Sequence, residues 1–335
     1  MPERIIIKSL YIEGFQDKRT IRLPLKDVSV FVGKNGVGKT TILRIIENIL
    51  LNKPKLISAI SCKKAILNLS NNQSITLSKI SEKDIFTAIN KSFSSDFKKI
   101  IKEVYEHDSV RTIPIDEESL KKMIFDKVQL HTTELIKSKI YEKGNKFITF
   151  SEEKTKQYIS EIQVRYISTV MISANSEKEM SFGNSKTKNI LDISMELELA
   201  SLKDKGKQAL TVFLKVINSL FSDTNKEMKY RSKKGFWVEI SDSELSISDL
   251  SSGEKQLLFI LATAANTIGG PAIFLMDEPE ISLHLSWQEK IIDSVKSINP
   301  DIQLIIATHS PAIVMNGYMD SYIDMNSIDI EVNNE

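Results

Sequence analysis

Apolar residues in the first eighty positions fall into short runs that predict β-strands. The run at residues 28–32, VSVFV, is apolar at four of its five positions, which is typical of a strand buried on both faces. A Gly-rich segment follows it directly, and we expect a helix from residue 40 to about residue 51. The other strands expected in this part are residues 5–12, 21–25, 65–69 and 74–80.

The pattern changes at residue 82. From there to residue 163, apolar residues recur every three or four positions with charges of both signs between them, which predicts a mainly helical insertion and favours a solvated lid over a binding surface. A strand is then expected at 164–172, a long amphipathic helix at 196–221 and short strands at 227–247. The predicted domains are an N-terminal lobe (1–81), the helical insertion (82–163) and a C-terminal lobe (164–335).

Residues 257–276 contain no charged residue and are long enough to cross a bilayer. The break at 266–271, NTIGGP, instead predicts a buried helix at 257–267 followed by a buried strand at 272–276. The N-terminus lacks a signal-peptide pattern, and one cysteine, Cys62, fits a small buried residue in a reducing compartment. We therefore expect a cytoplasmic protein without a membrane partner.

Charge nearly cancels over the whole chain. The 45 Lys and Arg residues and the 44 Asp and Glu residues leave a formal net charge of +1. A protein that grips nucleic acid over most of its surface usually shows a strong basic excess. The composition therefore gives no support to that function, although it is compatible with a local basic patch.

Residues 33–40, GKNGVGKT, match the phosphate-binding pattern G-x-x-x-x-G-K-[ST]. In such a loop backbone N–H groups surround the phosphates, Lys39 would reach the β- and γ-phosphates, and the Thr40 hydroxyl would ligate Mg²⁺. A buried strand before the loop and a helix after it supply the expected context. The residues predicted to bind ATP here are Asn35, Gly36, Gly38, Lys39, Thr40 and Thr41.

A second apolar strand, residues 272–276, ends in Asp277 and Glu278. Ligands of open α/β sheets bind at the carboxyl ends of the strands, so these acids are candidates for the same site as the loop. Asp277 would hold Mg²⁺ through water, and Glu278 would orient and deprotonate an attacking water. The alternative interpretation is that both are ordinary exposed acids at the end of a strand. The presence of a phosphate-binding loop in the same chain makes this alternative weak.

Two further polar clusters stand at the ends of regular elements. Ser251, Ser252, Gly253 and Glu254 stand just before a predicted helix, and at a helix N-terminus free N–H groups and the helix dipole favour an anion. Ser251 can also serve as a simple N-cap, with Glu254 in the first turn. His309 follows the apolar strand 305–308 and could hydrogen-bond the γ-phosphate or the attacking water.

The order of these motifs resembles the ABC ATPases: a phosphate-binding loop, an LSSGE signature, two acids after an apolar strand, and a histidine. More narrowly it is similar to the soluble SMC/RecF/OLD-like branch, often labelled AAA-15 or AAA-21. The segments that carry this likeness are DEPEISLH at 277–284 and THSP at 308–311. The resemblance covers residues 1–80 and 225–325, and the middle of the chain matches no family that we can name.

This resemblance implies an α/β fold, an ABC-type P-loop head with a mixed sheet, and ATP and Mg²⁺ as ligands. It also implies a head-to-tail homodimer or larger assembly. Ser251 and Gly253 of one subunit would then contact ATP bound to the other, and residues 280–284 would lie at the seam.

The sequence departs from the family in one motif and leaves two roles open. Ser252 and Glu254 replace the first Gly and the Gln of the usual LSGGQ signature, a substitution common in the SMC-like branch. Phe15 is the candidate platform for adenine. The glutamine of the Q-loop is not placed, and the candidates are Gln73, Gln129, Gln157 and Gln163.

The process that ATP hydrolysis would drive is inferred by comparing the chain with ATPases that carry additional domains. Only 26 residues follow His309, which leaves no room for the nuclease domain of OLD-type proteins, and the insertion lacks the heptads of SMC arms. The leading hypothesis is an ATPase sensor or scaffold that controls a separate nuclease or toxin, as in bacterial anti-phage systems such as PARIS and Septu. The alternatives are a RecF-like DNA repair ATPase and a soluble ABC transport subunit.

Overall fold

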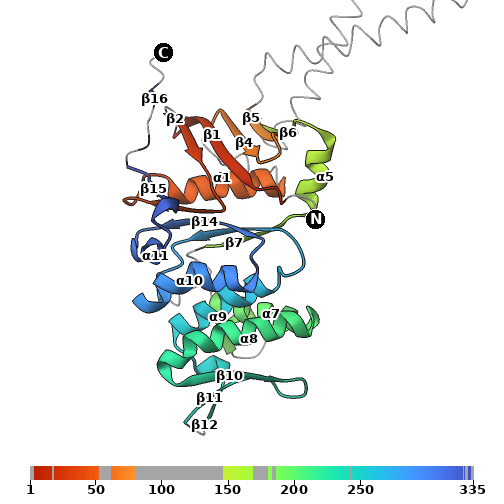
Figure 1. Ribbon diagram of the computed structural model, residues 1–335, viewed down its shortest axis with the longest axis vertical. Coiled ribbons are helices and arrows are strands. Elements are labelled where there is room, and N and C mark those ends of the chain that lie inside the picture. The colour runs from red at the N-terminus through yellow and green to blue at the C-terminus, as the bar shows by residue number, and fades with distance from the viewer. Residues whose placement is uncertain are drawn as a thin grey trace, which may run out of the picture.

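The computed structural model describes residues 4–16, 19–52, 62–79, 146–168, 180–182, 186–241, 243–326, 328 and 331–332. Most of the predicted insertion, residues 82–145, lies outside this described part, and so does Gln129. The described residues form two main sheets with one helix between them and a layer of helices below (Figure 1).

The N-terminal part is a six-stranded antiparallel sheet in the order β16-β2-β1-β4-β5-β6. Alternation of buried and exposed positions along β1 and β4 directs one face of this sheet toward the core. Its strands are β1 (Ile7–Phe15), β2 (Arg19–Pro24), β4 (Lys64–Leu69), β5 (Ser74–Lys79), β6 (Lys146–Phe150) and β16 (Glu331–Val332).

A five-stranded parallel sheet in the order β15-β3-β14-β13-β7 forms the centre of the molecule. All seven residues of β14 and all six of β13 are buried, which explains why these strands read as continuous apolar runs. The strands are β3 (Val28–Val32), β7 (Gln163–Ile167), β13 (Ala272–Asp277), β14 (Ile302–Thr308) and β15 (Tyr322–Asp324).

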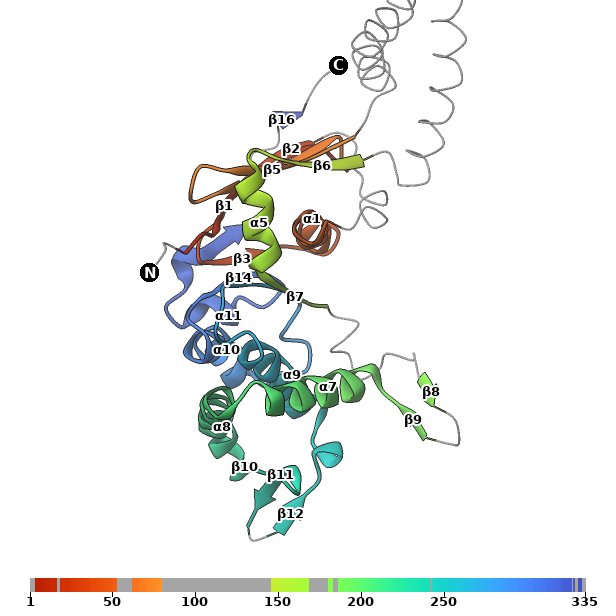
Figure 2. The same ribbon diagram turned by 90° about the vertical axis from the view of Figure 1, so that its right-hand side faces the viewer.

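Helix α1 (Lys39–Leu51) lies between the two sheets, and Figure 2 shows it end-on in that position. It packs with Phe31, Leu275 and Ile305 from the upper face of the parallel sheet. Fully burying a side chain of this size contributes about 1.5–3 kcal/mol, so the layer holds the helix after the phosphate-binding loop firmly against the strands.

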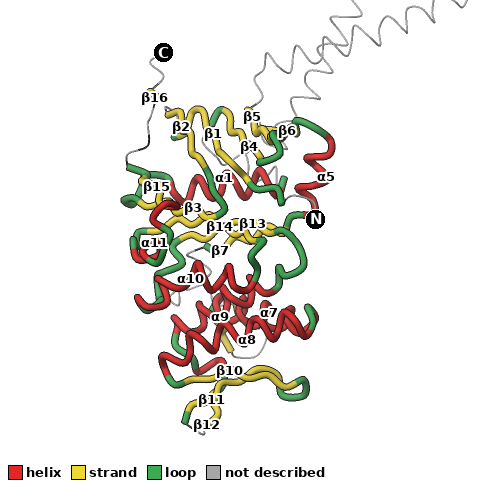
Figure 3. The backbone as a smooth tube through the Cα atoms, in the orientation of Figure 1, coloured by secondary structure: helices red, strands yellow, loops and turns green. Residues whose placement is uncertain are grey.

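The lower face of the parallel sheet is covered by helices (Figure 3). They are α7 (Ile190–Asp204), α8 (Lys207–Phe221), α9 (Ser252–Ala265) and α10 (Leu285–Ile298), and the short α11 (Ala312–Met315) follows β14. Below α8 lies a three-stranded antiparallel sheet of β10 (Lys226–Arg231), β11 (Gly235–Ile240) and β12 (Ser243–Leu245). A two-stranded pair, β8 (Met180–Phe182) and β9 (Lys186–Lys188), precedes α7.

The prediction of an α/β fold is confirmed, and so is the break in residues 257–276, because α9 ends at Ala265 and β13 begins at Ala272. Within the described ranges, no helix is long and apolar enough to cross a membrane. Cys62 is buried, as expected.

Two predictions differ from the structure. The single helix expected at 196–221 is wrong: the chain forms α7 and α8, separated at Gly206, whose φ of 103° is incompatible with a continuing helix. Residues 146–163, expected within the insertion, form β6, helix α5 (Glu153–Glu161) and the start of β7. Since Lys146 pairs with Lys79 of β5, this stretch extends the N-terminal sheet.

Candidate nucleotide-binding site

The loop between β3 and α1 has the backbone of a phosphate-binding loop. Gly36 and Gly38 have φ values of 84° and 99°, which favour glycine. A Cβ atom on Gly38 would stand 2.4 Å from Cζ of Phe15, so the loop also requires glycine for space. Phe15 is fully buried beneath this loop, and the expectation that it stacks on adenine is therefore not supported.

Lys39 turns its ammonium group back over the loop. Its Nζ donates to the carbonyl oxygens of Gly33 at 2.9 Å and Lys34 at 3.3 Å, and it lies 2.8 Å from Nε2 of His309. A lysine ammonium has three donors and no acceptor, so Nε2 of His309 is the acceptor in that contact. The side chain is only 5% exposed, which concentrates its charge inside the loop.

Thr40 and Asp277 meet across the space between α1 and β13. The Thr40 hydroxyl lies 2.9 Å from both carboxylate oxygens of Asp277, and the Tyr166 hydroxyl lies 3.4 Å from Oδ2. Burial raises the pKa of Asp277, opposed by hydrogen bonds from Thr40 and Tyr166. A hydroxyl and a carboxylate are the hard oxygen ligands that Mg²⁺ prefers. Among the described residues, no group of three or more His, Cys, Asp or Glu side chains is suited to hold a metal ion.

Glu278 follows Asp277 and points at the same space. Its backbone φ is 52°, an uncommon conformation for a residue with a side chain and one that costs about 1–3 kcal/mol. Oε1 of Glu278 lies 3.0 Å from Nε2 of His309 and 3.7 Å from Nζ of Lys39. Burial, and then the neighbouring Glu280, raises the pKa of Glu278 to about 7. Burial and the charge of Lys39 lower the pKa of His309, so its imidazole is neutral at pH 7.

Glu280 holds the loop that carries His309. Oε1 of Glu280 accepts hydrogen bonds from the Thr308 hydroxyl, from the His309 backbone N–H at 2.9 Å and from the Ser310 N–H at 3.2 Å. Gln288 adds a second connection, because it donates to the Leu283 carbonyl at 2.9 Å and accepts from the Ser310 hydroxyl at 2.7 Å. Residues 280–284 and the histidine loop are therefore one connected unit.

The signature residues begin α9 with a complete capping box. Ser251 Oγ accepts from the Glu254 N–H at 3.3 Å, and Glu254 Oε2 accepts from the Ser251 N–H at 2.9 Å. Lys226 lies 2.6 Å from the other oxygen of Glu254, whose carboxylate is therefore turned inward. Ser251 is exposed and Ser252 half-buried, which leaves their polar groups accessible.

Gly253 lies directly against residues 280–284. A Cβ atom there would stand 2.3 Å from the Ser282 carbonyl oxygen, so only glycine fits. Gln256 donates to the Pro279 carbonyl oxygen in the same interface. Within the described ranges, no hydrogen bond or ion pair joins residues 251–254 to the phosphate-binding loop of this chain.

The structure thus brings five predicted residues from three distant segments together: Lys39, Thr40, Asp277, Glu278 and His309. Asn35, Gly36, Gly38 and Thr41 lie in or directly after the same loop. The candidate Q-loop residues lie elsewhere. Gln73 bonds Glu152 in a surface contact, Gln163 donates to the Thr267 carbonyl at the opposite end of β7, and Gln157 is exposed on α5.

Tyr166 and Arg44 are site residues that the sequence reasoning missed. Arg44 hydrogen-bonds Tyr166 and acts electrostatically on Asp277. Arg44 stands four positions after Thr40 on α1, and this helical spacing places both on one side of the helix. That spacing was the available signal.

Comparisons with known proteins give a matching family and several relatives. A family model described as "AAA domain, putative AbiEii toxin, Type IV TA system" matches residues 70–316. The chain is 23% identical over 337 residues to the Septu protein PtuA of Bacillus thuringiensis, covering 95% of this chain and 75% of PtuA. It is 33% identical over 98 residues to the Retron Vc95 probable ATPase of Vibrio cholerae serotype O1 biovar El Tor, and 36% identical over 87 residues to the Retron Ec83 probable ATPase of Escherichia coli.

The retron matches are partial. They cover 26% and 23% of this chain but only 19% and 16% of those two proteins. Among solved structures, the SMC head domain from Thermotoga maritima is similar with a TM-score of 0.48 and 13% identity, over 97% of this chain and 98% of that one.

Proposed function

Because the chain belongs to this AAA-domain family, we propose that it binds ATP with Mg²⁺ and hydrolyses the γ-phosphate bond. We infer from its relatives in retron and Septu systems that it is an ATPase of the defence-related kind. The proposal rests on one observation: the carboxyl ends of β3, β13 and β14 bring together the phosphate-binding loop, two carboxylates and a histidine. These residues are Lys39, Thr40, Asp277, Glu278 and His309.

Each residue then has a role that follows from its chemistry. Thr40 and Asp277 would hold Mg²⁺, which would neutralise phosphate charge when bound. Lys39 would exchange the carbonyl oxygens of Gly33 and Lys34 for phosphate oxygens, which are stronger acceptors for an ammonium group. Glu278 would accept the proton of the attacking water, and a pKa near 7 suits a base at neutral pH.

His309 is suited to hold either the γ-phosphate or the attacking water. Its neutral imidazole can donate through one nitrogen while the other accepts. Its Nε2 lies 3.0 Å from Oε1 of Glu278 and 2.8 Å from Nζ of Lys39, so a group bound beside these atoms would lie within reach of all three side chains.

The signature supports a site completed by a second copy. Ser251 is exposed at the start of α9, while Gly253 packs on residues 280–284 of its own chain. Ile281 within that segment and Leu285 directly after it are exposed apolar residues, 48% and 58% accessible. We propose that this face meets the phosphate-binding loop of another copy head to tail, with Ser251, Ser252 and Gly253 over its ATP.

The test is the variant Glu278→Gln, which keeps the shape of the side chain and removes the base. It should bind ATP, release no phosphate and accumulate as a dimer in size-exclusion chromatography with light scattering. Lys39→Ala, which removes the phosphate-binding ammonium, is the control and should stay monomeric. A Glu278→Gln protein that stays monomeric with saturating ATP would show that the head-to-tail proposal is wrong.

We further propose that the ATPase controls a separate effector, a nuclease or toxin. The similarity to PtuA over 95% of the chain and a family named for a toxin system favour this role over DNA repair or transport. Residues 80–145 are the proposed docking or sensing segment. Because Lys79 pairs with Lys146, a two-residue Asn-Gly turn can replace this segment without changing the register of β5 and β6.

The shortened protein should keep basal hydrolysis and lose binding to the product of the neighbouring reading frame in a co-expression pull-down. Loss of hydrolysis and binding together would instead make the segment part of the ATPase fold. Retained binding would place the docking surface elsewhere.

A further inference from the structure

A cluster of positive charge lies on the side of the molecule away from the N-terminal sheet. It is formed by two turns, the α7–α8 turn and the β10–β11 turn, and all of its six cations are exposed. We call it the basic surface, and its residues are Lys203, Lys205, Lys207, Arg231, Lys233 and Lys234.

The two turns are neighbours in space. Nζ of Lys203 lies 3.9 Å from the position of a Cβ atom on Gly235, which begins β11. In Figure 1 both turns lie on the right-hand side, at the ends of α8 and β10. Chain segments about thirty residues apart in sequence therefore contribute to one surface.

The charge balance of this surface differs from that of the chain. Among the described residues, the acids that accompany it are Asp204, Glu239 and Glu244; Glu239 accepts from Trp237 and Glu244 pairs with Lys234. Six positive charges less three negative ones leave +3, and the formal charge of +1 for the whole chain then leaves −2 for the rest. The positive charge is therefore concentrated at one place.

Trp237 holds two of these cations in place. The Arg231 guanidinium lies 5.5 Å and the Lys234 ammonium 4.3 Å from the centre of its ring. The indole N–H donates to Glu239 at 3.1 Å, and the ring is only 5% exposed, so its orientation is set by the sheet. Cations stacked on an aromatic ring are ordered before a ligand arrives, which lowers the entropy lost on binding.

We propose that the basic surface binds the phosphate backbone of a nucleic acid. Several exposed cations on two adjacent turns fit a repeating line of phosphates, each contact releasing a counterion. A membrane is disfavoured because none of the exposed large apolar side chains among the described residues lies in either turn, whereas an interfacial anchor needs them. A single small anion would use one or two of the cations and leave the others without a role.

Helix α7 and strand β10, which lead into the two turns, also contact α9, the helix that begins with the signature residues. Lys226 begins β10 and lies 2.6 Å from Glu254, while Asp192 of α7 lies 2.9 Å from Lys255. A strand of nucleic acid that spans both turns would fix α7 and β10 relative to each other, and these elements position the start of α9. Nucleic acid should therefore stimulate ATP turnover, an inference that rests on the proposed ATPase function, whereas the binding itself does not.

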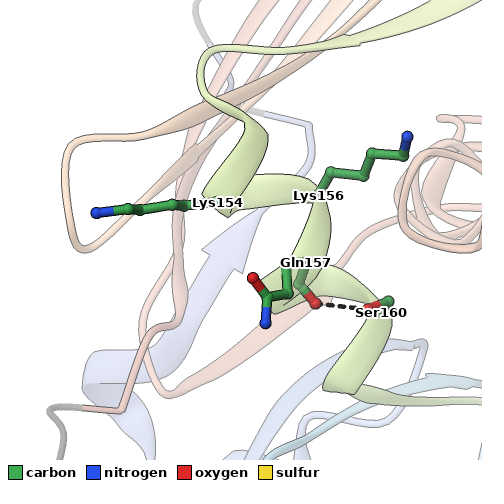
Figure 4. Close-up of a pocket in the computed structure, with 4 residues that line it drawn as sticks. All are labelled: Lys154, Lys156, Gln157 and Ser160. Carbon is green, nitrogen blue, oxygen red and sulfur yellow. Dashed lines mark hydrogen bonds between the residues drawn. The ribbon is translucent and has the colours of Figure 1, made fainter.

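The test measures fluorescence anisotropy of labelled single-stranded DNA, duplex DNA and RNA without ATP, over a series of salt concentrations. The test variant is Lys205→Gln with Lys233→Gln, one exposed lysine from each turn. The matched control is Lys154→Gln with Lys156→Gln on α5, which removes the same charge. Figure 4 shows these two side chains extending from α5 in different directions, and α5 is not part of either turn.

The wild-type and control proteins should bind equally, and the Lys205/Lys233 variant should bind at least about 10-fold more weakly at 50 mM salt. Its slope of log affinity against log salt should also fall by about 1.5–2, because two phosphate contacts are lost. Equal loss in both double variants, no binding of any nucleic acid by the wild type at 50 mM salt, or binding only to anionic lipid vesicles would overturn the proposal.

Coupling is tested separately with Lys226→Met. It should leave nucleic-acid affinity within about 2-fold, since Lys226 lies outside both turns, and abolish the stimulation of phosphate release. Binding without stimulation in the wild type would refute the coupling and leave the binding site standing. Absence of any hydrolysis would contradict the ATPase proposal instead.

Discussion

Glu280 holds the loop that carries His309 through three hydrogen bonds, which we call the Glu280 clamp. We predict that ATP hydrolysis depends on this clamp, although Glu280 does not contact the phosphate-binding loop. Its Oε1 accepts from the Thr308 hydroxyl and from the N–H groups of His309 and Ser310. Glu280→Ala removes this acceptor and frees the loop that carries His309. The expected effect is loss of catalytic rate with ATP binding nearly unchanged.

The size of the loss in kcat can be estimated from the hydrogen bonds that the donors keep in the Glu280→Ala variant. The Ser310 N–H keeps a 2.8 Å bond to the Thr308 hydroxyl, so the alanine variant leaves one backbone donor, that of His309, without its acceptor. A hydrogen bond to a charged group contributes about 1.5–3 kcal/mol. If about 2 kcal/mol of this is needed to hold His309, kcat should fall about 30-fold, because 1.36 kcal/mol is a factor of ten. Glu280→Gln keeps an acceptor oxygen and should lose less than about 5-fold.

The assay is phosphate release at saturating ATP and Mg²⁺, with ATP affinity measured by calorimetry. The control is Glu161→Ala, which removes an exposed acid at the end of α5. If Glu280→Ala turns over ATP as fast as this control, the clamp does not position His309. Equal losses in the alanine and glutamine variants would show that the charge of Glu280 matters and its hydrogen bonds do not.

The glutamine variant adds a pH signature that a purely structural role would not produce. Burial, and then Glu280, raises the pKa of Glu278 to about 7, so hydrolysis should be lost as pH falls through that value. Removing the charge of Glu280 lowers the pKa of Glu278. The acid limb should therefore move to lower pH, by less than about one unit because burial is the larger cause. An unchanged limb would refute the assignment of Glu278 as the titrating base.

Three further predictions concern the signature and the metal. Lys226→Met leaves Glu254 buried without its cation and should cost about 2 kcal/mol of unfolding free energy at pH 7. Because the pKa of Glu254 is held below its ordinary value of 4.5, this deficit should shrink in thermal melts as pH falls below 4.5. Gly253→Ala places a Cβ atom 2.3 Å from the Ser282 carbonyl oxygen and should abolish the ATP-dependent dimer in light scattering while monomers still bind ATP. Thr40→Ala should lower Mg²⁺-dependent hydrolysis by more than about 100-fold, yet leave metal-free ATP binding within about 3-fold in calorimetry.

The parts of the site that the sequence could predict are those at the ends of buried parallel strands. Such strands read as uninterrupted apolar runs, and polar residues directly after them are conspicuous. This is why Asp277, Glu278 and His309 could be identified before the fold was known. The clamp could not be predicted, because Glu280 reaches residues 308–310 only when β13 and β14 are adjacent, and adjacency is a property of the sheet order.

The wrong and shifted predictions have physical causes. Apolar spacing continues in phase from α7 into α8, so a pattern of period 3.6 does not reveal that Gly206 turns the chain. Strand β6, KFITF, has only five residues and is flanked by charged segments, so its alternation is too short to stand out from a helical background. Its place at the edge of the N-terminal sheet follows from pairing with β5, which lies 67 residues before it in the register Lys79 to Lys146.

The formal net charge of the chain is a poor predictor of nucleic-acid binding, because it does not show where the charges lie. A formal charge of +1 is a sum over 335 residues, and it argued against a general grip on nucleic acid. Binding depends instead on charges within about a Debye length of the ligand, roughly 8–10 Å at ordinary salt. The turn at Gly206, which broke the predicted helix, is also what brings Lys203 beside the β10–β11 turn. Predicting one continuous helix at 196–221 therefore concealed both the end of α7 and the basic surface on which we expect phosphate to bind.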